Sequence, residues 1–268
     1  MPPVTTIDRS GSFEPLRSLL VVVVTLVLSV SGCGGSSSSS GSIPAQAQTA
    51  RVRFLDGAPS LETLIGGVPQ PICPDPSNPC YLQVNKQTVT QGFYYGSMTS
   101  FTNVTAGALS LVARVAAGYA VGPLTTTALS PGKQYTLIVV GSYPKYQVLA
   151  FEEPASSGSA ALSLYNAAPS TPQASFGTFR ASTHSNFTKR GSARFGELAT
   201  VSLGKSVTDV GGYVGNAGSP IGSVTPSQID SFDRRNALPY HNIARLSLFL
   251  FDAKSSSGVG AVFGSLDR

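Results

Sequence analysis

A short pattern that occurs twice constrains the fold of this chain more than any other feature. Residues 161–170 match residues 51–60 at an offset of 110, and both stretches end in Ala-Pro-Ser. Residues 194–201 echo residues 94–101 in the same order, at a smaller offset. The smaller offset is expected if the loop from Cys73 to Cys80 is an insertion in the first copy. Two divergent copies of one module explain this order; one continuous sandwich with accidental similarity is the alternative.

Within each copy the pattern indicates short strands separated by turns. Residues 135–140 are apolar on both faces after Thr136, which indicates a central strand covered on both sides. Turn-forming residues stand before it at 130–133 and after it at 143–146. The strand predicted at 244–251 takes the corresponding place in the second copy.

The composition favours a β protein with many turns over a helical one. Charged residues make up 12% of the chain, against about 25% in an average globular protein, and there are 28 Gly and 19 Pro. We therefore expect an all-β fold of two tandem β-sandwich modules, immunoglobulin-like or transthyretin-like. The predicted division is a signal peptide at 1–32, a tether at 33–50, module 1 at 51–153, a linker at 154–160 and module 2 at 161–268.

The N-terminal residues have the pattern of an export signal. Arg9 and Arg17 precede an uncharged run of twelve residues, Leu19 to Val30. Twelve residues are too few for a membrane-spanning helix, which needs about 20, but they suit the apolar region of a signal peptide. The alternative, a buried core strand, would have to lead straight into a serine homopolymer.

Val30-Ser31-Gly32-Cys33 resembles the bacterial lipobox, with Val30 where Leu is usual. The resemblance implies that Cys33 is diacylglycerated on sulfur and becomes the new N-terminus after cleavage. Each buried CH₂ group contributes about 0.8 kcal/mol, so two or three acyl chains hold a protein firmly on a membrane. We expect a bacterial cell-envelope protein anchored by lipid. Gly34 after the cysteine favours the outer membrane or cell surface over the inner membrane.

Residues 34 to about 50 have the composition of a flexible tether, since Gly and Ser dominate them and little apolar surface is available to bury. Such a segment allows a folded region to stand off the membrane.

The other two cysteines, Cys73 and Cys80, enclose a short Pro-rich segment. In an exported protein this pair is most simply a disulfide. A metal site is not expected, because neither His184 nor His241 is near in sequence and two thiolates do not complete a zinc shell.

The pattern as a whole resembles an uncharacterised bacterial family, domain-of-unknown-function family 4397. The residues that carry the resemblance are Arg51 to Phe54 with Ala58-Pro59, Ala106-Gly107 leading into Leu109 to Leu111, and Pro131 to Leu137. The resemblance implies tandem β-sandwich repeats in exported and lipid-anchored proteins, and it brings no catalytic residue and no known ligand.

Catalytic motifs do not emerge from the sequence. There is no Gly-x-Ser-x-Gly elbow. The chain has two histidines, and the sequence singles out no serine and aspartate as their partners in a Ser-His-Asp triad. The acidic residues are scattered, and Glu152-Glu153 opens a stretch typical of a linker, so a glycosidase pair is not indicated. We expect no enzyme activity, no cofactor and no metal.

Three surface features are candidates for binding. Positive charge is concentrated early in the second copy and can face acidic polymers or lipid heads, although a solvated surface is the simpler interpretation; the residues are Arg180, Lys189, Arg190 and Arg194. The polar stretch from Ser231 to His241 is a long connection of the kind in which binding sites often lie. Tyr94, Tyr95 and Tyr213 can stack on sugars, although such aromatics more often pack within sheets.

The expected function is a non-catalytic binding, adhesion or structural role at the envelope. The expected partners are the membrane, through the lipid, and envelope polysaccharide or peptidoglycan, but not nucleic acid. A carbohydrate- or peptidoglycan-binding module is one alternative, and a hydrolase with a site between the modules is another.

Overall fold

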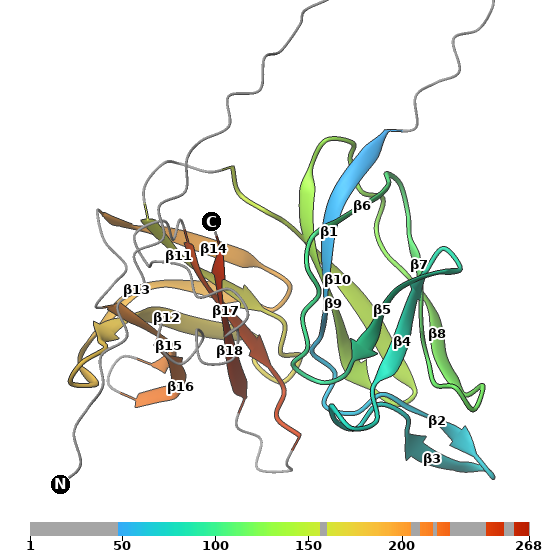
Figure 1. The fold of residues 1–268 in the computed structure, drawn as a ribbon. Helices are drawn as coiled ribbons and strands as arrows, with labels where there is room; N and C mark the ends of the chain where they lie inside the picture. Colours follow the sequence, from blue (N-terminus) through green and yellow to red (C-terminus); the bar gives the residue numbers. More distant parts are fainter. Residues whose placement is uncertain are drawn as a thin grey trace, which may run out of the picture. The chain divides into compact units, whose positions relative to one another are not determined.

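The described part of the protein is all-β, as the sequence predicts. The computed structural model describes residues 48–155, 160–204, 210–216, 219–225, 245–254 and 260–267, which lie in one compact unit, Gln46–Arg268. Eighteen strands and no helix occur in these residues (Figure 1). No helix among them has the length and apolar character needed to cross a bilayer.

Strands β1 to β10 make up what we call the first module. They are β1 (Thr49–Asp56), β2 (Glu62–Ile65), β3 (Val68–Pro71), β4 (Cys80–Val84), β5 (Gln87–Phe93), β6 (Thr102–Thr105), β7 (Ser110–Arg114), β8 (Ala120–Thr125), β9 (Gln134–Ser142) and β10 (Lys145–Glu152). Two four-stranded sheets have the orders β10-β9-β1-β6 and β5-β4-β7-β8, and β2 pairs with β3 in a separate ribbon.

Strands β11 to β18 make up the second module. They are β11 (Ala160–Asn166), β12 (Gln173–Arg180), β13 (Ser185–Arg194), β14 (Leu198–Gly204), β15 (Val210–Asn216), β16 (Ser219–Val224), β17 (Arg245–Phe251) and β18 (Ala261–Asp267). Their two sheets have the orders β18-β17-β11-β14 and β13-β12-β15-β16. These are the orders of the first module with each strand replaced by its counterpart.

Hydrogen bonds reproduce this correspondence residue by residue. β1 pairs parallel with β9 and antiparallel with β6, as β11 does with β17 and β14. The N–H of Gly96 donates to the carbonyl of Asp56 (2.7 Å), and the N–H of Gly196 donates to that of Asn166 (2.8 Å). The repeated segments of the sequence therefore occupy the same places in the two modules.

Each module has its own apolar core between its two sheets, and a third apolar cluster joins the modules. Leu137 and Val139 of β9 lie in the core of the first module. Ile138 and Val140, on the opposite face of the same strand, pack with Tyr165, Phe249 and Phe251 of the second module. β9 is thus buried on both faces, which confirms the central strand predicted from its apolar run.

The first module carries an insertion that the second lacks. The chain from β1 to β4 runs through residues 57–79, whereas the chain from β11 to β12 needs only residues 167–172. The insertion holds the β2–β3 ribbon, whose two-residue turn is Gly66-Gly67 with φ of 63° and 84°. Positive φ at both turn positions is the requirement of a type I′ hairpin, which glycine meets without strain. The predicted Cys73–Cys80 disulfide is confirmed at the end of this insertion.

Glu152 and Glu153 belong to the first module, although by composition they open a stretch typical of a linker. Glu152 is the last residue of β10, and Glu153 is buried with a side chain that is 3% exposed. Glu153 is ordered because it forms ion pairs with arginines of both modules. Local composition cannot show these partners, since they are distant in the sequence.

Several predicted features lie outside the described residues. They are the signal segment with Val30, Ser31 and Gly32, the lipidation residue Cys33, the tether up to residue 47, and the stretch from Ser231 to His241.

Candidate functional site

The insertion helps to form a groove at one end of the first module. The groove has a volume of about 280 Å³ and lies between the beginning of β2, most of β8 and the turn from β9 to β10. Its lining residues are Glu62, Thr63, Ala120, Val121, Gly122, Pro123, Leu124, Tyr143, Pro144 and Tyr146. We refer to it as the Tyr143 groove. Because β2 has no counterpart in the second module, the repeated scaffold alone does not provide this groove.

The hydroxyl of Tyr146, one of the lining residues, holds the insertion in place. It donates to the carbonyl of Ser60 (2.9 Å) and accepts from the N–H of Glu62 (2.8 Å). Burial raises the pKa of Tyr146 to about 12, so this hydroxyl keeps its proton over the physiological range. The insertion is therefore tied to β10 at the residue where β2 begins.

Polar and aromatic groups remain available on the walls of the groove. The Glu62 carboxylate has no ion pair or hydrogen bond with any described residue, and the side chains of Glu62 and Tyr143 are partly exposed. The lining residues include no Lys, Arg or His. The groove therefore offers aromatic and proline surfaces beside one uncompensated negative charge.

The groove lies at the end of the module that is opposite to the entry of the chain. The described chain enters β1 at Thr49 and leaves it at Asp56. β9 is parallel to β1, so the turn at Tyr143-Pro144 lies at the Asp56 end, where Figure 1 also shows the β2–β3 ribbon. At about 3.3 Å per residue, β1 alone separates the two ends by roughly 25 Å.

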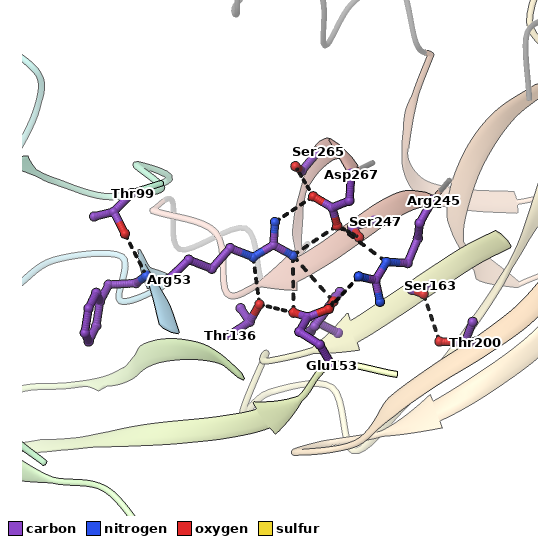
Figure 2. A network of polar contacts seen from close by, with 12 residues as sticks. Arg53, Thr99, Thr136, Glu153, Ser163, Thr200, Arg245, Ser247, Ser265 and Asp267 are labelled. Atoms are coloured by element: carbon purple, nitrogen blue, oxygen red, sulfur yellow. Dashed lines mark hydrogen bonds and ion pairs between the residues drawn. The ribbon is translucent and has the colours of Figure 1, made fainter. Parts of the chain in front are cut away.

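A second polar site, which is largely buried, joins the two modules (Figure 2). Arg53 of β1 makes a bidentate pair with Asp267 of β18, with N–O distances of 2.7 and 3.1 Å. Glu153 accepts from the hydroxyl of Tyr165 (2.7 Å) and forms an ion pair with Arg245 (2.7 Å). We call this set the junction cluster; its further members are Thr136, Ser247 and Ser265.

The charges of the junction cluster stabilise one another. Burial alone would lower the pKa of Arg53 and raise that of Asp267, but their mutual attraction and hydrogen bonds reverse both shifts. The Arg53 pKa is raised and the Asp267 pKa is lowered, so both remain charged. The Arg53 guanidinium also lies over the rings of Phe101 (4.8 Å) and Phe249 (5.5 Å), which adds cation–π attraction.

Comparison with known protein families gives one match. The sequence model of a family described as "Domain of unknown function (DUF4397)" matches residues 73–176. The chain resembles the DUF4397 family. No curated protein matches it.

The DUF4397 match runs from β4 through β10 and into β12 of the second module. It includes Ala106-Gly107, Leu109 to Leu111 and Pro131 to Leu137, which suggested the resemblance, but not Arg51 to Phe54 or Ala58-Pro59. It also includes the β8 and β9–β10 walls of the Tyr143 groove. The β2–β3 ribbon, which supplies Glu62, lies outside the matched residues.

The basic residues predicted as a binding surface lie on two neighbouring strands. Arg180 ends β12, and Lys189, Arg190 and Arg194 lie on β13, the edge strand paired with it. All four are exposed. Arg190 donates to the hydroxyl of Thr178 (3.3 Å), and no acidic side chain forms an ion pair with any of the four within the described residues.

The tyrosines considered for sugar stacking have mostly structural roles. Tyr95 packs edge-on against Phe251 and Phe263 and donates its hydroxyl to the carbonyl of Asp252 (2.7 Å). Tyr213 is buried and packs against Phe187. Tyr143, in contrast, is partly exposed and lines the Tyr143 groove. From the sequence it is predicted only to be part of a turn.

Sequence reasoning did not identify the members of either site. In the sequence Arg53 stands out only as part of the segment Arg51 to Phe54, and Asp267, its partner, is 214 residues away. The Gly66-Gly67 turn between Ile65 and Val68 was the one local signal for the inserted ribbon. Within the described residues, no group of three or more His, Cys, Asp or Glu is placed to hold a metal.

Proposed function

We propose that this chain is a lipid-anchored protein of the bacterial cell envelope that binds a ligand without catalysis, through the Tyr143 groove. The lipid is attached at Cys33, and the residues that follow tether the two modules to the outer membrane or the cell surface. The function is to hold a binding groove at a distance from the lipid surface.

The position of the groove supports this proposal. A tether that ends at the beginning of β1 leaves the Tyr143 groove at the far end of the first module. A groove at this end can reach envelope polymers or another surface while the anchor stays in the membrane. Loops inserted on a rigid β scaffold are a common location of binding sites, and this groove depends on such an insertion.

The junction cluster supports a defined geometry for the pair of modules. Arg53 and Glu153 are almost completely buried, Asp267 is largely buried, and each has a partner of opposite charge. An arrangement that separates such a pair while one member stays buried leaves an uncompensated charge in the interior, which is strongly unfavourable. The modules thus present the groove from a fixed frame.

The non-catalytic part of the proposal rests on the composition of the groove. Glu62 is the one carboxylate among its lining residues, whereas glycoside hydrolysis normally uses two carboxylates on either side of the scissile bond. The alternative is a hydrolase with its site between the modules. That junction is filled by paired charges and by buried side chains such as Ile138 and Phe249, which supports the non-catalytic proposal.

Metabolic labelling with a palmitate analogue tests the anchor. We expect label in the wild-type protein, none in Cys33→Ala, and a shift of this variant from the membrane fraction to the soluble fraction. Cys73→Ser/Cys80→Ser, which keeps Cys33, is the matched control and should remain labelled. Label that persists in Cys33→Ala contradicts the anchor.

A further inference from the structure

We infer that the Tyr143 groove takes a single pyranose ring without acidic groups, as a unit of an envelope polysaccharide or of a peptidoglycan glycan strand. This inference rests on the binding role proposed above and names the class of its ligand.

The size of the groove limits its occupant. A volume of about 280 Å³ is just below the range for small-molecule pockets, roughly 300–1,000 Å³. A single ring with its substituents suits that space, and a longer polymer would place one unit in the groove and continue on either side of it.

The chemistry of the walls matches two faces of a sugar ring. Tyr143 and Pro144 offer flat apolar surfaces to the C–H face of a pyranose, and the negative face of an aromatic ring attracts polarised C–H groups. The Glu62 carboxylate accepts hydrogen bonds only, and hydroxyl groups at the ring edge are donors. A ligand that satisfies both walls needs an apolar face beside a row of hydroxyls.

The charge of the groove excludes acidic ligands. Glu62 is the one charged residue among the lining residues, so a uronic acid, a phosphate or a nucleic acid backbone would meet repulsion there. A hydroxyl or an amine on the ring is compatible with the carboxylate.

A peptide fits this groove less well than a sugar. β8 is an edge strand of its sheet, but Pro123 lies within it and has no N–H to donate. A peptide strand therefore cannot add to β8 along its whole length. A Pro-rich peptide, which needs no strand pairing, would use the same aromatic surfaces and is an outcome that the experiment must separate.

The experiment uses the purified full-length protein in detergent and titrates it with four probes: neutral β-glucan oligosaccharides, N-acetylglucosamine oligosaccharides as the neutral sugar of peptidoglycan glycan strands, a polyuronate and a Pro-rich peptide. We expect binding of one or both neutral saccharides. Preference between the first two probes distinguishes the polysaccharide from the peptidoglycan source.

Two substitutions locate the binding in the groove. Tyr143→Ala should weaken saccharide binding about tenfold through the loss of the ring, and Glu62→Gln should do so through the loss of a charge-assisted hydrogen bond. Tyr119→Ala and Glu152→Gln are the matched controls, because these exposed residues lie outside the groove, and they should bind as the wild type does.

The outcomes separate the inference from the proposed function. Saccharide binding that Tyr143→Ala and Glu62→Gln leave unchanged overturns the inference, as does binding of the polyuronate alone. Binding of the Pro-rich peptide alone, lost in Tyr143→Ala, overturns the sugar but leaves the groove as a binding site. Binding of none of the four probes overturns the inference, while the labelling of Cys33 still decides the anchor.

Discussion

Asp56 and Asn166 occupy equivalent positions at the ends of β1 and β11, but only Asn166 has hydrogen-bond partners for both polar atoms of its side chain. Asn166 Nδ2 donates to the carbonyls of Thr171 (3.0 Å) and Ala193 (3.2 Å), and its Oδ1 accepts from Ala168 (3.3 Å). Asp56 Oδ1 accepts from Ala58 (3.0 Å), while its buried Oδ2 has no partner among the described residues. The first module therefore carries a carboxyl group where the second carries a fully satisfied amide.

Asp56→Asn should make the protein more stable at alkaline pH. Burial raises the pKa of Asp56 to about 8, from an ordinary value near 3.8. Because the folded state binds this proton more tightly than the unfolded state, the stability that it contributes falls as the pH rises from about 4 to about 8. Asparagine is uncharged at every pH and removes this dependence, so at pH 8 we expect a gain of about 1–3 kcal/mol in the free energy of unfolding. Urea denaturation of the wild type and of Asp56→Asn at pH 5 and pH 8 measures this difference in the free energy of unfolding.

Other charged and titratable groups near Asp56 are Lys254, Tyr95 and Tyr146, and of these the charge of Lys254 lowers the Asp56 pKa.

Asn166→Asp is the mirror-image control. It should introduce in the second module the alkaline destabilisation that Asp56→Asn removes from the first. An equal effect of Asp56→Asn at pH 5 and pH 8 would show that the carboxyl does not titrate in this range.

Asp267→Asn should destabilise the protein by about 3–5 kcal/mol, because it leaves the buried Arg53 without its bidentate partner. The lowered pKa of Asp267 means that the wild-type pair contributes its stability above the ordinary carboxyl pKa and loses it in more acidic solution. The difference between the two proteins in urea denaturation should therefore be full at pH 7 and shrink below about pH 4.

Lys133→Gln is the control for this prediction. Lys133, which directly precedes β9, forms an ion pair with Glu152 of β10, with side chains 55% and 48% exposed. An exposed pair of this kind is screened by solvent and contributes little to stability, so Lys133→Gln should leave the free energy of unfolding nearly unchanged. Similar losses from Lys133→Gln and Asp267→Asn would mean that burial does not govern the junction cluster.

Gly177→Ala should destabilise the second module by about 1–3 kcal/mol, since an added Cβ would stand 2.0 Å from the backbone oxygen of Thr188. Gly92→Ala, in a strand of the first module, meets nothing within 4 Å and should be neutral or slightly stabilising. Thermal unfolding followed by circular dichroism gives the midpoints of Gly177→Ala and Gly92→Ala for comparison. Equal midpoints for the two variants would argue against the close pairing of β12 with β13.

Loss of the Cys73–Cys80 disulfide should cost about 2–3 kcal/mol in the chain-entropy account of a short loop. Cys73→Ser/Cys80→Ser measured against the wild type in urea gives this value. The wild type with a reductant should approach the variant, whereas the variant itself should not respond to the reductant. A wild type that also fails to respond would mean that the bond is not formed in solution.

Much of the scaffold could be predicted from the sequence, because its signals are local. The apolar run at 135–140 and the Ala-Pro-Ser repeat are contiguous, and they placed the central strand and its counterpart. The junction cluster could not be predicted in this way, because Arg53 and Asp267 gain meaning only after two sheets pack together. The Tyr143 groove was missed for the same reason, since Glu62, Pro123 and Tyr143 come from three separated segments.

The apolar cluster around Ile138 and Phe249, together with the junction cluster, couples the folding of the two modules. Either module alone would expose these aromatic and aliphatic side chains to water, and Arg53 would lose the strongest of its partners. The interface energy is therefore gained only when both modules are folded. We expect a single unfolding transition that every spectroscopic probe reports at the same denaturant concentration, rather than two steps separated by module.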